Sequence, residues 1–100
     1  MNRKFHYPRI KGKKALYSIF IKKSAERDLD SVNEPFFSKI ISAIETLSKN
    51  PKNVQVKKLV KRDSEYRLRV GDYRVLFYID ENSKSVHIAR ILHRKDAYKV

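Results

Sequence analysis

The sequence predicts an α+β domain in which an antiparallel β-sheet packs against an N-terminal αα-hairpin, in the order β-α-α-β-β-β-β. Three observations carry this prediction. Apolar residues recur at helical spacing in residues 25–50 and at strand spacing from residue 54 onward. The chain has 100 residues, and its hydrophobic content of 41% supports a folded core. Residues 15–100 are therefore predicted to form one domain.

The first half of this domain is predicted to hold one strand and two helices. The apolar run from Leu16 to Ile21 contains β-formers and is typical of a strand. Ser24 is a candidate N-cap for a helix over residues 25–31. A second helix begins near Pro35, whose missing N–H costs little in a first turn, and ends before Pro51. Its apolar face is formed by Phe36, Phe37, Ile40, Ile41, Ile44 and Leu47.

The second half is predicted to hold four strands. Residues 54–60 form a strand, and the polar residues 61–64 form a loop. A hairpin follows to about residue 80, and the last strand covers residues 85–92. Residues 95–99 are interpreted as a short helix or tail.

The hairpin sorts its residues by face, because strand side chains alternate. A turn at residues 71–72 places Arg69 opposite Arg74, with Arg67 next in line. The opposite face is formed by Leu68, Val70, Tyr73, Val75, Phe77 and Ile79. Like charges directly opposite one another destabilise a sheet by up to roughly 1 kcal/mol. We therefore interpret the three arginines as an anion site, most simply for a phosphate.

The positive charge is concentrated in two parts of the chain. The formal net charge is +13, with +8 in residues 1–23, −2 in residues 24–51 and +7 in residues 52–100. Residues 1–14 lack periodicity and are interpreted as a basic N-terminal arm. This distribution favours a polyanionic partner. The alternative is a charged surface that serves solubility.

Several classes of function have no support in the sequence. Cysteine is absent, and Gly12 and Gly71 are the two glycines, so thiolate metal sites and glycine-rich phosphate loops are excluded. No His-x-x-x-His pair is present. Asp28 and Asp30 are too close in sequence to face one another on a helix and are interpreted as solvated surface residues. We expect no metal or cofactor, no membrane span and a cytoplasmic location.

The residues after the last strand complete a candidate cleft. If that strand pairs with the second hairpin strand, His93, Arg94, Lys95 and Tyr98 lie beside Arg74. Arginines stabilise charge in phosphoryl transfer, histidine transfers protons near neutral pH, and tyrosine stacks on bases. This set suffices for metal-free RNA cleavage, in which the 2′-OH of the RNA attacks the adjacent phosphorus.

Each candidate has a simpler interpretation. Arg67 and Arg69 fit the solvent side of an amphipathic strand, and Arg74 fits an ion pair with Asp72 or Asp96. His93 fits a packed or exposed histidine, and Tyr98 fits an anchor for the tail. His87 lies in mid-strand and is interpreted as structural.

The hairpin and the C-terminal residues resemble a known family. The runs Lys58-Leu59, Tyr66 to Asp80 and Arg90 to Tyr98 resemble the RelE/ParE superfamily of toxins from toxin–antitoxin pairs. The run Lys23 to Leu29 resembles the first helix of that family. The resemblance implies a microbial-ribonuclease-like α+β fold and, for the RelE branch, cleavage of messenger RNA in the ribosomal A site.

The resemblance also implies roles for individual residues. Arg67 and Arg69 match basic residues that assist the reacting phosphate, and Arg74 matches a transition-state arginine. Arg94 matches an arginine that stabilises the leaving group, and Tyr98 matches a tyrosine that orients the substrate. We add His93 as the candidate acid or base, because arginine stays protonated. The expected RNA-binding residues are Lys57, Lys58, Lys61, Arg62 and Lys95.

The resemblance implies partners and leaves two other functions open. An acidic antitoxin would neutralise the basic cleft, and the complex would bind operator DNA through the antitoxin. Ribosomes and mRNA are the expected targets of the free protein. The alternatives are a ParE-like inhibitor of DNA gyrase without nuclease activity and a basic RNA-binding module.

Overall fold

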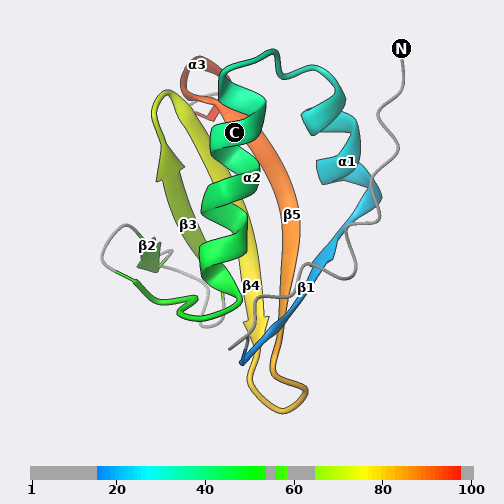
Figure 1. Cartoon of the computed structure of the whole chain (residues 1–100), viewed down its shortest axis with the longest axis vertical. Helices are drawn as coiled ribbons and strands as arrows, with labels where there is room; N and C mark the ends of the chain where they lie inside the picture. The colour runs from blue at the N-terminus through cyan, green and yellow to red at the C-terminus, as the bar shows by residue number, and fades with distance from the viewer. Residues whose placement is uncertain (1–15, 54–55, 59–64, 98–100) are drawn as a thin grey trace.

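The computed structural model describes residues 16–53, 56–58 and 65–97 (Figure 1). Its elements are β1 (Ser18–Ile21), α1 (Lys23–Asp30), α2 (Phe36–Leu47), β2 (Val56–Lys58), β3 (Glu65–Val70), β4 (Tyr73–Asp80), β5 (Ser85–His93) and α3 (Arg94–Ala97). The predicted order of elements is confirmed. The basic arm, Lys61, Arg62 and Tyr98 lie outside the described residues. No helix in the described ranges is long and apolar enough to cross a membrane.

The five strands form one mixed sheet in the order β1-β5-β4-β3-β2. The α+β class is confirmed, but the sheet is not wholly antiparallel as the sequence predicted, because β1 runs parallel to β5. Tight turns force neighbouring strands to be antiparallel, as in the β3–β4 and β4–β5 pairs. β1 is joined to the rest of the sheet through two helices, and that long connection permits a parallel pairing.

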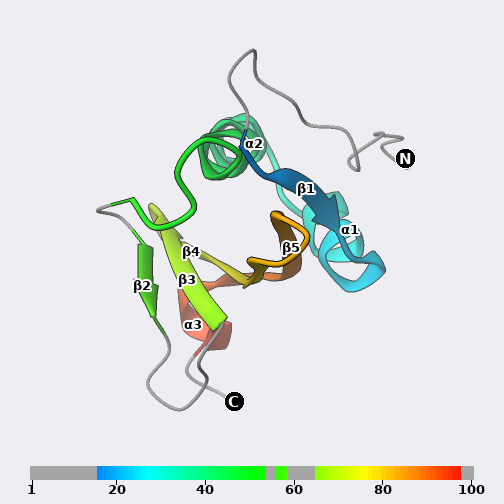
Figure 2. The ribbon, with the colours of Figure 1, turned by 90° about the horizontal axis from the view of Figure 1, so that it is seen from below.

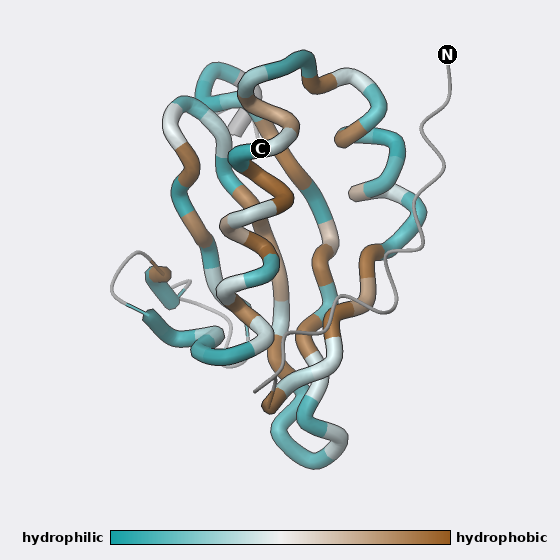
Figure 3. Tube along the Cα trace, viewed as in Figure 1, coloured by the Kyte–Doolittle hydropathy of each residue, from teal (hydrophilic) through white to brown (hydrophobic). Residues whose placement is uncertain are grey.

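One face of the sheet is covered by α2 (Figure 2). The buried residues of this helix meet the apolar sides of β3, β4 and β5, and apolar and polar residues alternate along these strands in Figure 3. The fully buried side chains at the centre are Ile40, Ile44, Leu47, Leu68, Val75 and Ile88. Burying one such side chain contributes about 1.5–3 kcal/mol, so this layer fixes which side of each strand faces α2.

The helix α1 covers the edge of β5 that β1 leaves open. β1 pairs with Ser85–Ile88 of β5, so the backbone groups beyond that range need other partners. The Ser24 hydroxyl donates to the Ala89 carbonyl at 2.7 Å, and the Asp28 carboxylate accepts from the Ile91 N–H at 2.8 Å. The prediction of Ser24 as an N-cap was therefore wrong, because its hydroxyl binds the neighbouring strand.

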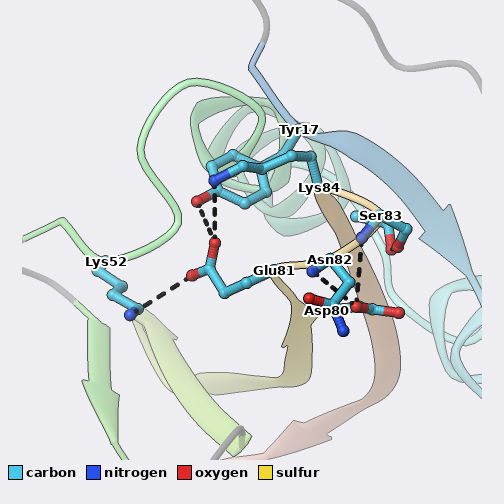
Figure 4. Close-up of polar contacts among 8 residues, drawn as sticks. Tyr17, Lys52, Asp80, Glu81, Asn82, Ser83 and Lys84 are labelled. Carbon is cyan, nitrogen blue, oxygen red and sulfur yellow. Dashed lines mark hydrogen bonds and ion pairs between the residues drawn. The ribbon is translucent and has the colours of Figure 1, made fainter.

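The turn between β4 and β5 is tied to two distant segments at the end of the sheet away from Gly71 (Figure 4). The Glu81 carboxylate accepts from the Tyr17 hydroxyl at 2.8 Å and from Lys84 Nζ at 3.3 Å, and it lies 3.6 Å from Lys52 Nζ. The hydrogen bond from Tyr17 is the main cause of a lowered pKa of Glu81. Within the turn, Asp80 Oδ1 accepts from the Asn82 N–H at 3.0 Å.

Candidate functional site

The β3–β4 hairpin has the predicted register. Arg69 lies opposite Arg74, and the flanking pairs are Leu68 with Val75 and Val70 with Tyr73. Gly71 has a φ of +58°, a left-handed conformation that glycine adopts without strain. The predicted positions of both arginines are therefore confirmed, because the turn residue and the alternation of faces both indicate this register.

The arginines lie on the side of the sheet opposite α2, which we call the open face. Strand alternation and register assign to it Phe20, Lys57, Glu65, Arg67, Arg69, Arg74, Leu76, Tyr78, His87, Arg90 and Leu92. Of the two neighbouring lysines on β2, Lys57 is opposite Arg67 and joins this face. Lys58 is opposite Tyr66 and lies on the α2 side, so the two lysines cannot contact one ligand on the same face.

The guanidinium groups of Arg69 and Arg74 approach the same main-chain carbonyl. Arg74 is 6% exposed, and its Nη1 lies 3.2 Å from the Tyr73 oxygen and 3.4 Å from the Gly71 oxygen. Arg69 Nε lies 3.5 Å from the Gly71 oxygen. These distances are at the long end for hydrogen bonds. The carbonyls thus orient the two cations without neutralising them.

The ion pairs formed by the described residues leave the hairpin arginines unneutralised. None of these ion pairs involves Arg67, Arg69 or Arg74. Asp72, which the sequence offered as a partner for Arg74, lies 3.9 Å from Arg94 Nη1 instead. In the part of the chain that the structure describes, the hairpin arginines therefore have no carboxylate partner that would compete with an anion such as phosphate.

The helix α3 brings Arg94 to the hairpin turn. The Arg94 N–H donates to the Asp72 carbonyl, and the side chains of both residues are largely exposed. Lys95 is also exposed, and its N–H donates to His93 Nδ1 at 3.3 Å. Arg94 and Lys95 therefore lie at the same end of the sheet as Arg74, as predicted.

His93 lies on the other face of the sheet. It is directly opposite Tyr73, and their rings meet edge to face with centroids 5.1 Å apart. Tyr73 in turn contacts Phe36 of α2, with centroids 5.8 Å apart. The sequence predicted that His93 and Arg74 converge. They share an end of the sheet but not a face, because the partner of Arg74 on β5 is Leu92.

Sequence reasoning missed the role of Asp28. Its carboxylate binds Arg90 through two contacts, to Nε at 2.7 Å and to Nη2 at 3.2 Å, in addition to the Ile91 N–H. Asp28 is therefore not the solvated surface residue that the sequence suggested. It also lines a pocket of about 370 Å³ with Tyr73 and His93. A contact across more than 60 residues leaves no local signal in the sequence.

A row of aromatic rings on the open face was also missed. The His87 ring stacks between Phe20 and Tyr78, from three adjacent strands. His87 is half-buried, and burial lowers its pKa. Its interpretation as a packed residue agrees with this environment. The row depends on the β1–β5 register, which no short sequence pattern indicates.

No group of three histidines, aspartates or glutamates in the described ranges is arranged to hold a metal ion. The open face instead offers Lys57, Arg67, Arg69 and Arg74 as cations, with Arg94 at its end. Arginine forks bind phosphate oxygens in pairs and stabilise charge that develops on them. The fold and this face define a small basic α+β protein with cations gathered on one side of its sheet.

The chain belongs to the RelE/ParE superfamily of toxins. The family model for the ParE toxin of type II toxin–antitoxin systems, parDE, matches residues 19–98. A protein of Methanocaldococcus jannaschii that carries the name toxin RelE1 is 30% identical over 86 residues, which are 83% of this chain and 96% of that protein. The protein is thus a RelE-like toxin of a type II toxin–antitoxin system.

Solved structures of RelE toxins share the fold. The RelBE2 toxin–antitoxin complex of Mycobacterium tuberculosis matches with a TM-score of 0.70 and 28% identity, over 78% of this chain and 98% of the other. The RelB–RelE complex of Methanococcus jannaschii gives a TM-score of 0.68 and 26% identity, over 80% and 95%. The isolated Escherichia coli RelE toxin gives a TM-score of 0.69 at 12% identity, over 85% and 97%. The predicted superfamily is confirmed.

Proposed function

We propose that this toxin is a metal-independent, ribosome-dependent mRNA endonuclease that inhibits translation. The observation that carries the proposal is the pair of Arg69 and Arg74, opposed across the hairpin with no carboxylate between them among the described residues. Such a pair is unfavourable until an anion lies between the guanidinium groups. A phosphate of RNA is the anion that the fold and the basic composition favour.

In the proposed reaction the RNA supplies its own nucleophile. The 2′-OH gives up its proton to a base and attacks the adjacent phosphorus. The bond from phosphorus to the 5′-oxygen breaks, that oxygen leaves with a proton, and a 2′,3′-cyclic phosphate remains. Arg67, Arg69 and Arg74 stabilise the negative charge on the phosphorus oxygens, and Arg94 stabilises the leaving group. Tyr98 is proposed to orient the substrate, in line with the resemblance. His93 is the acid–base candidate at this end of the sheet.

The position of His93 indicates that it contributes less to cleavage than Arg74 does. Because its ring packs against Tyr73 on the α2 side, it reaches a phosphate on the open face only around the end of the sheet. We therefore expect His93→Gln to lower cleavage less than Arg74→Ala does.

Primer extension on a defined mRNA with purified ribosomes tests the proposal. Wild type is expected to cut at A-site codons, and Arg74→Ala to lose at least tenfold in rate, since one lost charge contact costs about 2–4 kcal/mol at such a site. Arg27→Ala is the matched control, because Arg27 is exposed on α1. Intact mRNA after incubation with a folded, toxic wild-type protein would contradict the proposal.

Inhibition of DNA gyrase is the second candidate function, and the match to the ParE family model favours it. In that case a supercoiling assay would show inhibition by wild type, and Arg74→Ala would inhibit equally. If the supercoiling assay shows no inhibition while A-site cleavage is observed, the gyrase candidate is rejected.

We also propose an acidic antitoxin as the cognate partner. The structural neighbours include complexes with RelB-type antitoxins, and the charge of +13 on this chain complements an acidic partner. The open face is the surface that such a partner would neutralise. The complex would bind operator DNA through the antitoxin, and the lysine and arginine residues would then be unavailable to RNA.

A further inference from the structure

Three aromatic side chains form a continuous stack across the open face. Phe20 on β1, His87 on β5 and Tyr78 on β4 are directly opposite one another in the strand register. The Phe20 and His87 rings are 5.3 Å apart at 17°, and the His87 and Tyr78 rings are 4.6 Å apart at 8°. We call these three residues the aromatic row. Because the rings are nearly parallel, a further flat ring can stack on the end of the row.

The row ends in an exposed ring. Phe20 is 40% exposed and lies on β1, which is an edge strand of the sheet. The neighbouring Ile19 is fully buried and supplies the contact of β1 with the core. The partly buried Tyr17 and Ile21 also pack against the core, so β1 has contacts with it besides those of Phe20. Among the strands that the structure describes, none lies beyond β1 on that side of the Phe20 ring.

His87, at the centre of the row, is half-buried and hydrogen-bonded. The Ser85 hydroxyl lies 2.9 Å from His87 Nε2, and burial lowers the pKa of His87. Burial therefore favours the uncharged imidazole. The row behaves as one apolar stack, and every nucleobase has a π-face that can join such a stack.

Charge selects an RNA base over an apolar protein ligand. Lys22 follows Phe20 by two residues and is exposed, and its Nζ lies 5.4 Å from the centre of the Tyr78 ring. An ammonium group beside a stacking ring is the combination that single-strand-binding surfaces use for base and phosphate. A second copy of this chain, with its charge of +13, would be repelled.

The row and the arginines lie within reach of one strand of RNA. From Arg74 to Phe20 the path runs four residues along β4 and two strands across the sheet, which is roughly 16 Å. We propose that the aromatic row is a stacking site for a base of the RNA strand whose phosphate is held at Arg69 and Arg74. This inference rests on the proposed function in taking RNA as the ligand.

A fluorescent base tests the site without requiring cleavage. The probe is a short single-stranded RNA with a 2′-deoxy residue at the cleavage position and 2-aminopurine placed at successive positions in separate oligonucleotides. Wild type is expected to quench 2-aminopurine at one position on one side of the deoxy residue. Phe20→Leu should abolish that quenching and weaken binding by roughly five- to hundredfold, because it removes the π-face and keeps an apolar residue.

Three further variants make the result specific. Phe20→Tyr keeps the ring and should restore quenching. Phe36→Leu is the matched control, because Phe36 is also 40% exposed but packs against Tyr73 on the α2 side. It should bind and quench like wild type. Lys22→Gln leaves the row intact, so it should weaken RNA binding while the quenching at saturation persists. Circular dichroism checks that each variant is folded.

The outcomes separate this site from the proposed function. Binding by wild type without quenching at any position, or equal quenching by Phe20→Leu, would overturn the stacking site whatever the result on ribosomes. Quenching that depends on Phe20 in a protein that leaves mRNA intact would retain the site and reject the nuclease. A change in self-association rather than in RNA binding with Phe20→Leu would assign the row to a protein contact and overturn the inference.

Discussion

At the scale of single residues, the arginine pair of the hairpin is the basis of the proposed phosphate site. Arg69 is exposed and Arg74 is 6% exposed, yet both approach the carbonyl of Gly71 from opposite strands. A protein gains little stability from such a pair, because like charges repel across a sheet. We therefore propose that the pair serves ligand binding and not folding.

Replacing Arg69 separates these two contributions. Arg69→Thr removes the repulsion and introduces a β-former, so the free energy of unfolding of the free protein should stay the same or rise by up to about 1 kcal/mol. Cleavage should fall. Urea denaturation and primer extension measure the two effects, and Arg69→Lys, which keeps the charge, is the control. A loss of stability with cleavage retained would assign Arg69 a structural role.

His87 makes stability depend on pH in a predictable direction. Its pKa in the folded state is lowered from 6.5 by burial, so the unfolded chain binds more protons below that pH. Stability is therefore lost as the pH falls from about 6.5. His87→Phe keeps the ring but cannot titrate, so its melting temperature should fall less between pH 7 and pH 5.5. Equal slopes for the two proteins would show that His87 contributes nothing to this dependence.

At the scale of elements, α1 acts in place of a strand along half of β5. Ser24 and Asp28 bind backbone groups that β1 does not reach, and Asp28 also holds Arg90. Exposed strand edges are a risk for aggregation, and a covering helix removes that risk. The same contacts attach α1 to the second half of β5, the strand that leads into α3 and Arg94.

The Asp28 contact can be tested against a neighbouring aspartate. Asp28→Ala should lower the free energy of unfolding by about 1–3 kcal/mol, because it leaves the Ile91 N–H and Arg90 without their shared acceptor. Asp30→Ala is the control, since Asp30 is exposed near the end of the same helix, and it should change stability by less than about 0.5 kcal/mol. Denaturant unfolding compares them. Similar losses for both variants would argue against the covering role of Asp28.

At the scale of the whole molecule, the two sides of the sheet differ: one is packed into the core and the other carries cations. The α2 side holds the core, whereas the open face carries Lys57, Arg67, Arg69 and Arg74 and the aromatic row. A cationic face of this kind gathers a polyanion and makes its affinity depend on salt.

The salt dependence of RNA binding measures how many phosphates this face neutralises. For single-stranded RNA, the logarithm of affinity falls with the logarithm of salt concentration by about 0.7 per neutralised phosphate. Arg67→Gln should reduce the slope by about that amount, whereas Arg27→Gln, on α1, should leave it unchanged. Fluorescence anisotropy with an uncleavable RNA at several salt concentrations measures both. An unchanged slope for Arg67→Gln would place the RNA on another surface.

The sequence by itself determined the features that depend on neighbouring residues. The turn at Gly71 and the alternation of faces were sufficient to place Arg69 opposite Arg74, and the helical spacing in α2 was sufficient to identify the buried Ile40 and Ile44. These are local rules of backbone geometry and burial, so they can be read from short segments.

The tertiary structure decided what depends on contacts between distant segments. The parallel pairing of β1 with β5 stacked Phe20 on His87, and the docking of α1 paired Asp28 with Arg90 across 62 positions. The assignment of His93 to the α2 side followed from the register of β5 against β4, where a bulge between Leu76 and Phe77 shifts the pairing by one residue. Because a shift of one residue exchanges the two faces of a strand, that detail is visible only in the folded sheet.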